Sequence, residues 1–328
     1  MELETGAPLR PWRREALKQF LAREGLDLDE NVEYTVNLLE DDEIVASGSL
    51  DGIICKCIAV DPAHQGEGLT ATVLTALRQE AFARGKRHLF LYTKPKNRMM
   101  FSGLSFYPVA ETRDTLLMEN VRDGCKNFVA ALPRRENPGT VGAIVANCNP
   151  FTRGHQYLVE QAAEQCDTLY LFILSENKSL FPPQDRLALA RAGTAHLPNV
   201  LVCPTGDYLI SSATFPTYFI QDKSRIPQIR CGLDLEVFCT QFAPALGITR
   251  RFVGTEPLSP VTEAYNRALL ETLPARGIQV TVIDRKLSGD APISASRVRA
   301  LLDTRDWPAI APLVPETTLT YLQTRFCE

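Results

Sequence analysis

Residues 142–155 read GAIVANCNPFTRGH, and this stretch decides the fold of the C-terminal half of the chain. The apolar run that ends at Ala146 predicts a buried strand, and the segment rich in Asn and Pro after it predicts a loop. Thr152 then offers a capping hydroxyl to an amphipathic helix, and His155 lies in its first turn. The N–H groups of a first helical turn suit a phosphate, and Gly154 allows close approach to the backbone. A capped helix with a surface histidine is the alternative that these residues alone leave open.

Residues 293–299 read ISASRVR and form a second candidate anion site. Ser294 is a suitable helix N-cap, and Arg297 and Arg299 fall in the first turns after it. Arginine at this end of a helix opposes the helix dipole, and a bound anion would offset that cost. A solvated arginine pair on a capped helix explains the pattern equally well.

Around these motifs, strands alternate with helices. We expect strands at 141–146, 168–174, 200–203, 251–253 and 280–283, and helices at 154–165, 183–195 and 294–302. This alternation predicts an α/β domain of Rossmann type, with a parallel sheet covered by helices on both faces.

The polar segment LPRRENPG at residues 132–139 separates this region from the N-terminal part of the chain. Turn-forming residues between two regions of good periodicity indicate a domain boundary, so we predict domains at 1–135 and 139–328. In the first domain the pattern predicts helices at 9–24 and 69–84, a hairpin at 33–48 and strands at 55–60 and 89–92.

Residues 57–70 read CIAVDPAHQGEGLT, which predicts a strand, a turn with two glycines and a helix. The stretch resembles the acetyl-CoA pyrophosphate loop of GNAT-type acetyltransferases, whose pattern Gln65 and Gly68 match. The resemblance implies that Gln65, Gly66 and Gly68 bind a CoA-type group. Thr70 stands where that family has Gly or Ala. Further on, Asn97, Phe101 and Phe106 resemble the family's second cofactor motif, with Ser105 in place of the usual Gly. The resemblance implies an acetyltransferase-like fold that binds a CoA-type group, and no residue of this region stands out as a catalytic acid or base.

The two C-terminal motifs together resemble the paired signatures of the nucleotidyltransferase superfamily, in which both fold over one ATP. The likeness extends to the citrate lyase ligase family through residues 147–155, 211–216, 243–254, 260–262 and 293–299. It implies catalytic roles for His155, Arg299 and Lys178. The implied ATP-binding residues are Asn149, Pro150, Phe151, Thr152, Gly154, His155, Arg186, Ser294, Ser296, Arg297 and Arg299. A solvated loop position is the alternative for Lys178, and a helix-surface ion pair with Asp185 or another neighbour is the alternative for Arg186. Cys148 is expected to be a buried filler.

Composition sets further bounds. The formal net charge of −4 over 328 residues does not favour a nucleic-acid partner. Nine scattered cysteines, with no Cys-x-x-Cys pair, indicate reduced thiols in a cytoplasmic protein and no metal site. The chain shows no signal-peptide pattern and no apolar run of membrane-spanning length, so we expect no membrane partner.

The family resemblance implies that acetate and ATP, accompanied by Mg²⁺, give an acetyl-adenylate. The acetyl group then passes to the CoA-derived thiol of the acyl carrier subunit of citrate lyase. One alternative is a nucleotidyltransferase that moves AMP onto pantetheine phosphate or a mononucleotide. Another is a non-catalytic acyl-CoA sensor built on the N-terminal fold. A tRNA-charging enzyme is disfavoured by the net charge.

Overall fold

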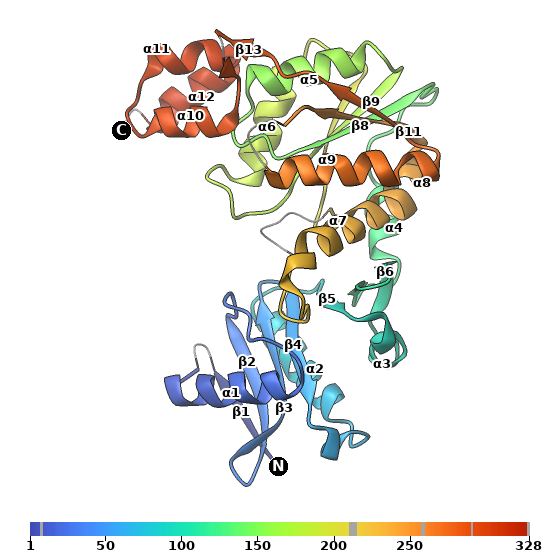
Figure 1. Ribbon diagram of the computed structural model, residues 1–328, viewed down its shortest axis with the longest axis vertical. Coiled ribbons are helices and arrows are strands. Elements are labelled where there is room, and N and C mark those ends of the chain that lie inside the picture. The colour runs from blue at the N-terminus through green and yellow to red at the C-terminus, as the bar shows by residue number, and fades with distance from the viewer. Residues whose placement is uncertain (7–8, 210–214, 257–259, 290, 327–328) are drawn as a thin grey trace. The chain divides into compact units, whose positions relative to one another are not determined.

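The computed structural model describes residues 1–6, 9–209, 215–256, 260–289 and 291–326 (Figure 1). It divides into two compact units, one formed by Met1–Gly124 with Phe215–Glu236 and the other by Cys125–Thr214 with Val237–Glu328. The polar separator at 132–139 thus lies within the second unit, and the proposed folding domains 1–135 and 139–328 stay a prediction. Ser211 to Thr214, part of one block that carries the family resemblance, lie outside the described residues.

The first unit is built on a seven-stranded sheet in the order β1-β2-β3-β4-β5-β7-β6. The strands are β1 (Glu2–Gly6), β2 (Tyr34–Glu40), β3 (Glu43–Asp51), β4 (Ile54–Val60), β5 (Phe90–Thr93), β6 (Tyr107–Glu111) and β7 (Leu116–Glu119). The helices are α1 (Pro11–Arg23), α2 (Leu69–Ala83) and α3 (Arg98–Gly103), with α7 (Ile226–Val237) late in the chain. The predicted hairpin is confirmed as β2 and β3, joined by a turn at Asp41 and Asp42.

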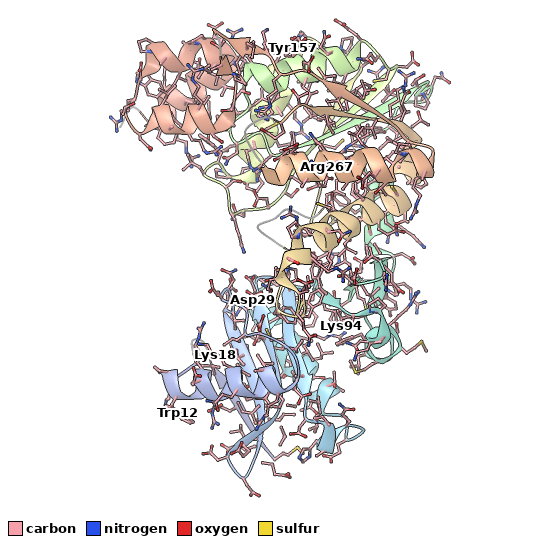
Figure 2. All side chains as sticks on the ribbon, in the orientation of Figure 1. Trp12, Lys18, Asp29, Lys94, Tyr157 and Arg267 are labelled. Carbon is pink, nitrogen blue, oxygen red and sulfur yellow. The ribbon has the colours of Figure 1, made fainter. Side chains whose placement is uncertain are left out.

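Helix α2 packs its apolar face on this sheet. Val73, Leu74 and Leu77 are buried in one core with residues of β2, β3 and β4. The helix approaches closely because Gly48 of β3 has no side chain: a Cβ there would lie 2.6 Å from Val73 Cγ1. Elsewhere in the unit, Lys56 is buried between Asp29 (Figure 2) and Asp51, at Nζ–O distances of 3.2 and 2.6 Å.

One pair of strands in this sheet separates along its length. β4 and β5 are parallel, but only Ile54 with Phe90 and Cys55 with Leu91 are in register. Beyond Cys55 the edge of β4 that faces β5 carries no ladder. Two parallel strands that diverge leave a wedge-shaped opening in the sheet, and this opening positions a cavity described below.

The second unit is a five-stranded parallel sheet in the order β10-β9-β8-β11-β12. Its strands are β8 (Val141–Ala146), β9 (Thr168–Ile173), β10 (Val200–Pro204), β11 (Ile248–Gly254) and β12 (Gln279–Ile283). Its helices include α4 (Gly124–Ala130), α5 (Arg153–Ala163), α6 (Pro183–Gly193), α8 (Ala243–Leu246) and α9 (Pro260–Thr272). The strand order reverses at β8, and ligands of open α/β sheets bind at the carboxyl ends of strands at such a point. The predicted parallel sheet is confirmed.

A small helical layer completes the second unit. It consists of α10 (Ala295–Leu302), α11 (Trp307–Ile310) and α12 (Glu316–Phe326), preceded by the short strands β13 (Leu287–Ser288) and β14 (Ala291–Pro292). These helices share a core of their own with Phe181. Asp185 on α6 accepts hydrogen bonds from Tyr321 Oη at 2.6 Å and Arg325 Nη1 at 2.8 Å. The layer therefore fixes α10 against the rest of the unit. No helix within the described ranges is long and apolar enough to cross a membrane.

Candidate active site

The N-terminus of α5 is closed by a reciprocal cap. Thr152 Oγ1 accepts a hydrogen bond from the N–H of His155 at 3.3 Å, and His155 Nδ1 accepts one from the N–H of Thr152 at 3.0 Å. A histidine thus takes the place that Glu or Gln usually has in a capping box. The N–H groups of Arg153 and Gly154 remain available at the mouth of the helix.

The cap also fixes the protonation of His155. Because Nδ1 accepts the N–H of Thr152, the proton of the neutral ring resides on Nε2, which can donate a hydrogen bond. Burial, with a smaller contribution from the positive Arg285, lowers the pKa of His155 from 6.5 to about 4. The side chain is therefore a neutral donor at physiological pH and not a cation.

Arg186 anchors the loop between β8 and α5 by hydrogen bonds. This side chain is fully buried. Its guanidinium donates to the carbonyls of Asn147 and Phe181 at 3.0 Å each, and also to the carbonyl of Glu176. Burial lowers the pKa of Arg186, and Glu176 opposes that effect. Arg186 therefore shapes the loop, and its predicted contact with ATP stays a prediction.

Asn149 connects this loop to Phe181 and to Arg299 on α10. Its Oδ1 accepts the N–H of Phe181 at 3.1 Å, and its carbonyl accepts Arg299 Nη1 at 2.6 Å. The Asn149–Pro150 peptide is cis. Phe151, which follows, is fully buried and its ring stacks on His155 at a centroid distance of 5.8 Å.

Cys148 is a buried filler, as expected from the sequence. Its thiol is 1% exposed, and burial raises the pKa of Cys148 to about 12. A thiol that stays protonated at neutral pH is a poor nucleophile.

The two sequence motifs meet in the structure. Ser294 caps α10 by accepting the N–H of Arg297 at 3.2 Å, and Ser296 Oγ accepts Arg299 Nη2 at 3.2 Å. Gly154 of α5 lies against Ile293, whose carbonyl oxygen would be 3.1 Å from a Cβ at position 154. Gly154 thus allows the N-termini of two helices to approach each other closely. From the sequence we expected it to allow a ligand to approach the backbone.

Two of the predicted cations remain exposed. Arg297 and Lys178 have solvent-exposed side chains, with no hydrogen bond or ion pair to any described residue. Lys178 lies in the loop after β9. That loop reaches the motif after β8 through Asn147 Nδ2, which donates to Ser179 Oγ at 3.2 Å. Both cations are free to meet an anion at this edge of the sheet.

Arg285 is a site residue that the sequence analysis missed. It follows β12, and its Nε donates to the carbonyl of Thr255, after β11, at 2.7 Å. It also forms an ion pair with Glu256. The next residue, Lys286, places Nζ 5.6 Å from the ring centroid of Tyr157 on α5 (Figure 2). Arg285 follows the carboxyl end of a parallel strand, and this position could have identified it from the sequence as a candidate site residue.

Together these elements form a candidate anion site. Two helix N-termini, the neutral donor His155 and Arg299 surround the carboxyl end of β8. Burial lowers the pKa of Arg299, which lies partly under the loop. Within the described ranges, no group of three or more His, Cys, Asp or Glu side chains could hold a metal ion.

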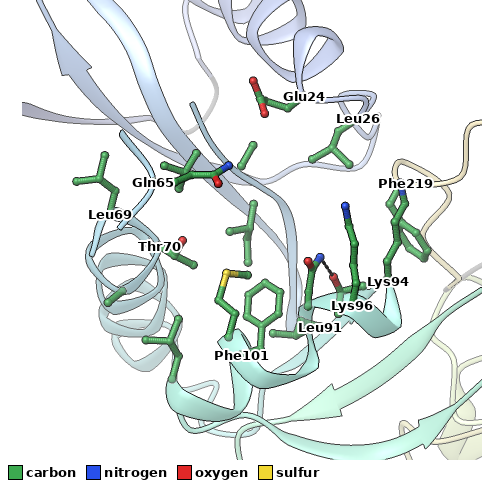
Figure 3. Close-up of a pocket in the computed structure, with 18 of the residues that line it drawn as sticks. Glu24, Leu26, Gln65, Leu69, Thr70, Leu91, Lys94, Lys96, Phe101 and Phe219 are labelled. Carbon is green, nitrogen blue, oxygen red and sulfur yellow. Dashed lines mark hydrogen bonds between the residues drawn. The ribbon is translucent and has the colours of Figure 1, made fainter. Parts of the chain in front are cut away.

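A second candidate site lies in the first unit. A cavity of about 880 Å³ opens where β4 and β5 separate, and Gln65, Gly66, Gly68 and Thr70 line one side of it (Figure 3). Gly66 and Gly68 have positive φ angles of 94° and 78°, and Gly68 is the N-cap of α2. The N–H groups of residues 66–70 have no acceptor among the described residues. This loop therefore has the free donors that an anion needs.

The second cofactor motif divides between the cavity and the core. Asn97 and Phe101 line the cavity, and Asn97 Nδ2 donates to Thr93 Oγ1 at 2.8 Å. Phe106 is fully buried in the core. Ser105 has a φ angle of 59°, which explains why Gly is usual at this position.

The fold and the candidate sites define a class: a nucleotidyltransferase-like unit with a candidate phosphate site, and an acetyltransferase-like unit with a cavity. Comparison with known proteins agrees with this assignment. Residues 141–322 match the profile of the citrate lyase ligase C-terminal domain, and residues 1–101 match that of the acetyltransferase (GNAT) family. The predicted fold class is confirmed.

Full-length relatives identify the family. The [citrate [pro-3S]-lyase] ligase of Klebsiella pneumoniae is 43% identical over 316 residues, which cover 94% of this chain and 92% of that protein. The Escherichia coli K12 protein of the same name is 43% identical, over 94% of this chain and 89% of that one. The chain belongs to the citrate lyase ligase family and is an enzyme, a ligase.

More distant similarities involve parts of the chain. A phosphopantetheine adenylyltransferase of Rhodopirellula baltica is 35% identical over 65 residues, which cover 19% of this chain and 36% of that protein. Thermotoga maritima TmcAL bound with alpha-thio ATP has a TM-score of 0.38 at 15% identity, covering 57% of this chain and 55% of that one. Escherichia coli ElaA has a TM-score of 0.33 at 16% identity, covering 37% of this chain and 99% of that one.

Proposed function

We propose that this ligase uses ATP to activate acetate and acetylates the CoA-derived thiol of the acyl carrier subunit of citrate lyase. One observation carries the proposal at the level of the site: Arg299 Nη1 meets the carbonyl of Asn149 at 2.6 Å. This contact brings the helix N-termini of two distant motifs to the same strand end. Family membership over 94% of the chain supplies the substrate class.

The site must support two successive substitution reactions. An acetate oxygen attacks the α-phosphorus of ATP, and the bond to pyrophosphate breaks. A thiol sulfur then attacks the carbonyl carbon of the resulting anhydride, and AMP leaves. Acetate is a poor electrophile and the anhydride is a good one, so the protein has mainly to position the reactants and to stabilise phosphate charge.

The residues of the chain divide these tasks. The N–H groups at the starts of α5 and α10 and the Nε2–H of His155 are fixed donors for phosphate oxygens. Fixed donors require no reorganisation when charge develops on a leaving pyrophosphate. We propose that Arg299 and Lys178 stabilise the same negative charge on the leaving pyrophosphate, because both are cations at this strand end. Asn149, Pro150, Phe151 and Arg186 then give the loop its shape, while Arg297 is a candidate for the outer phosphates.

Mg²⁺ fits the proposal as a companion of the nucleotide. With no cluster of three metal-ligating side chains in the described part of the chain, phosphate oxygens and water would supply its ligands. When bound it would neutralise part of the triphosphate charge.

For the first unit we propose that the cavity holds the carrier's prosthetic arm. The free N–H groups of the Gln65–Thr70 loop suit a pyrophosphate, which a CoA-derived arm contains. A cavity of 880 Å³ is of the size that takes a cofactor-sized ligand. Such a holder would bring the thiol to the ligase. We place the enzyme in the cytoplasm, where unpaired cysteines like the eight described here stay reduced.

The decisive experiment is ATP–pyrophosphate exchange with a panel of short carboxylic acids. We expect exchange with acetate and without any carrier protein. Exchange that needs pantetheine phosphate or a mononucleotide in place of acetate would favour the nucleotidyltransferase alternative. Absence of ATP-dependent chemistry, with acyl-CoA binding intact, would favour the sensor.

A further inference from the structure

A late segment of the chain closes one end of the cavity in the first unit. Tyr218 and Phe219 line the cavity, although Tyr218 follows Tyr92 of β5 by 126 positions. In Figure 3, Phe219 lies on one side of the cavity, and Gln65, Leu69 and Thr70 lie on the other. Both aromatic side chains are buried, at 7% and 4% exposure. The cavity is thus completed by residues that the sequence assigns to the other half of the chain.

Tyr218 stands at the point where β4 and β5 separate. Its hydroxyl donates to the carbonyl of Tyr92 on β5 at 3.0 Å and accepts the N–H of Cys57 on β4. These are the groups that would continue the ladder beyond Cys55 and Leu91. The side chain therefore bridges the two strands and occupies the narrow end of the wedge.

The late segment is firmly attached around this point. The N–H of Asp27 donates to the carbonyl of Tyr218 at 2.9 Å, and the carboxylate of Asp27 pairs with Lys223. Aromatic contacts join Phe219 to Tyr218 and to Phe215 at centroid distances of 5.2 and 6.4 Å. A residue with this many fixed neighbours forms a wall that a ligand cannot easily displace.

The direction of a bound thiol arm follows from the positions of the loop and the strand. A pyrophosphate at the loop would sit beyond Val60, because the loop follows directly after β4. From Val60 to Cys57 the free strand edge spans roughly 10 Å. An extended arm that follows this edge away from the loop therefore points its thiol at Tyr218 and Phe219.

We propose that Tyr218 and Phe219 form an end wall that limits the arm to a free thiol or a short acyl thioester. The proposal rests on the cavity being the arm holder described under the proposed function. A longer acyl chain would have to enter space that the two rings fill. Discrimination by an extra methylene in a filled apolar pocket amounts to roughly 10–200-fold.

The test is calorimetric binding of CoA, acetyl-CoA and hexanoyl-CoA to the full-length enzyme. We expect the wild type to bind the first two with similar affinity and hexanoyl-CoA at least about tenfold more weakly. Phe219→Ala should bring the affinity for hexanoyl-CoA to within a few-fold of the affinity for acetyl-CoA. Phe219→Leu tests the same expectation while opening a smaller cavity. Lys18→Ala, an exposed change on α1 outside the cavity lining, should keep the wild-type preference.

Two results would overturn the end wall alone: equal binding of hexanoyl-CoA and acetyl-CoA by the wild type, or an unchanged preference in both folded Phe219 variants. Failure of every CoA species to bind would remove the arm holder and the wall together. Acetate-dependent pyrophosphate exchange is measured without any CoA species. It therefore reports separately on whether the ligase chemistry stands.

Discussion

Two strand–loop–helix segments, one in each unit, carry the same candidate anion-binding device in different settings. After β8, the helix start is capped by Thr152 and His155 and faces a second helix start with Arg299. After β4, α2 begins at Gly68 without a side-chain cap, and the loop opens into a cavity of 880 Å³. Fixed donors and cations suit a site where charge changes during reaction, whereas open N–H groups beside a large cavity suit a site that only binds. The comparison predicts that mutations in the two loops affect different kinetic parameters.

The largest effect is expected from His155. We predict that His155→Ala lowers the rate of acetate-dependent pyrophosphate exchange by roughly 10²–10³, the usual cost of one preorganised donor. The alanine also removes half of the cap, so His155→Gln is the matched control: glutamine is a usual capping-box partner at this position. Both variants should lose the rate, while the glutamine variant keeps the melting temperature. Exchange within a few-fold of wild type in the alanine variant, which has no side-chain donor, would remove His155 from the chemistry.

Arg299 should have a smaller effect, concentrated in ATP binding. We predict that Arg299→Ala raises the ATP concentration for half-maximal exchange by about tenfold or more, the scale of one lost charge-assisted contact. ATP-dependent thermal stabilisation measures the same loss directly. Arg297→Ala, on the same helix and exposed, is the control with the weaker effect expected. Equal stabilisation of Arg299→Ala and wild type by ATP would contradict the proposed role.

The opposite signature is expected in the first unit. We predict that Gly68→Val raises the apparent KM for acyl carrier protein by about tenfold and leaves pyrophosphate exchange unchanged, because it removes binding and not chemistry. Gly85 is the matched control: its φ angle of 75° is close to the 78° of Gly68, and at both positions a Cβ would meet open space. Gly85→Val therefore carries the same backbone strain away from the cavity. Loss of exchange in Gly68→Val, with Gly85→Val active, would mean that the two loops are not separate in function.

Much of this comparison was visible in the sequence, because it depends on local signals. The apolar run before Asn147, the cap at Thr152 and the two glycines near Gln65 are patterns of neighbouring residues, and each predicted element forms. The contact between Gly154 and Ile293 depends on two segments that only the fold brings together. The same holds for the arginine that follows β12, whose importance comes from its place at the edge of the sheet.

The late segment shows most clearly what the sequence does not reveal. Phe215 to Glu236 lie in the sequence between β10 and β11 of the second unit, and no pattern in them indicates that they pack in the first. Tyr218 reads as an ordinary aromatic residue until its hydroxyl is placed between Cys57 and Tyr92. Burial and a hydrogen bond to a distant strand are properties of the tertiary structure.

The smallest effect is a dependence of stability on pH that only the capped loop should show. The pKa of His155 is lowered from 6.5 to about 4, so between these values the unfolded chain binds a proton that the folded chain does not. Stability should therefore fall as pH falls from 7 to 5, by roughly 1–2 kcal/mol from this group. His155→Gln cannot take up that proton, so its stability relative to wild type should improve over the same range. Urea unfolding of both proteins at pH 7, 6 and 5, with the transition of the second unit followed, measures the difference. A parallel pH dependence in the two proteins would show that folding does not lower the pKa of His155, and a buried neutral ring would then be the wrong description of this cap.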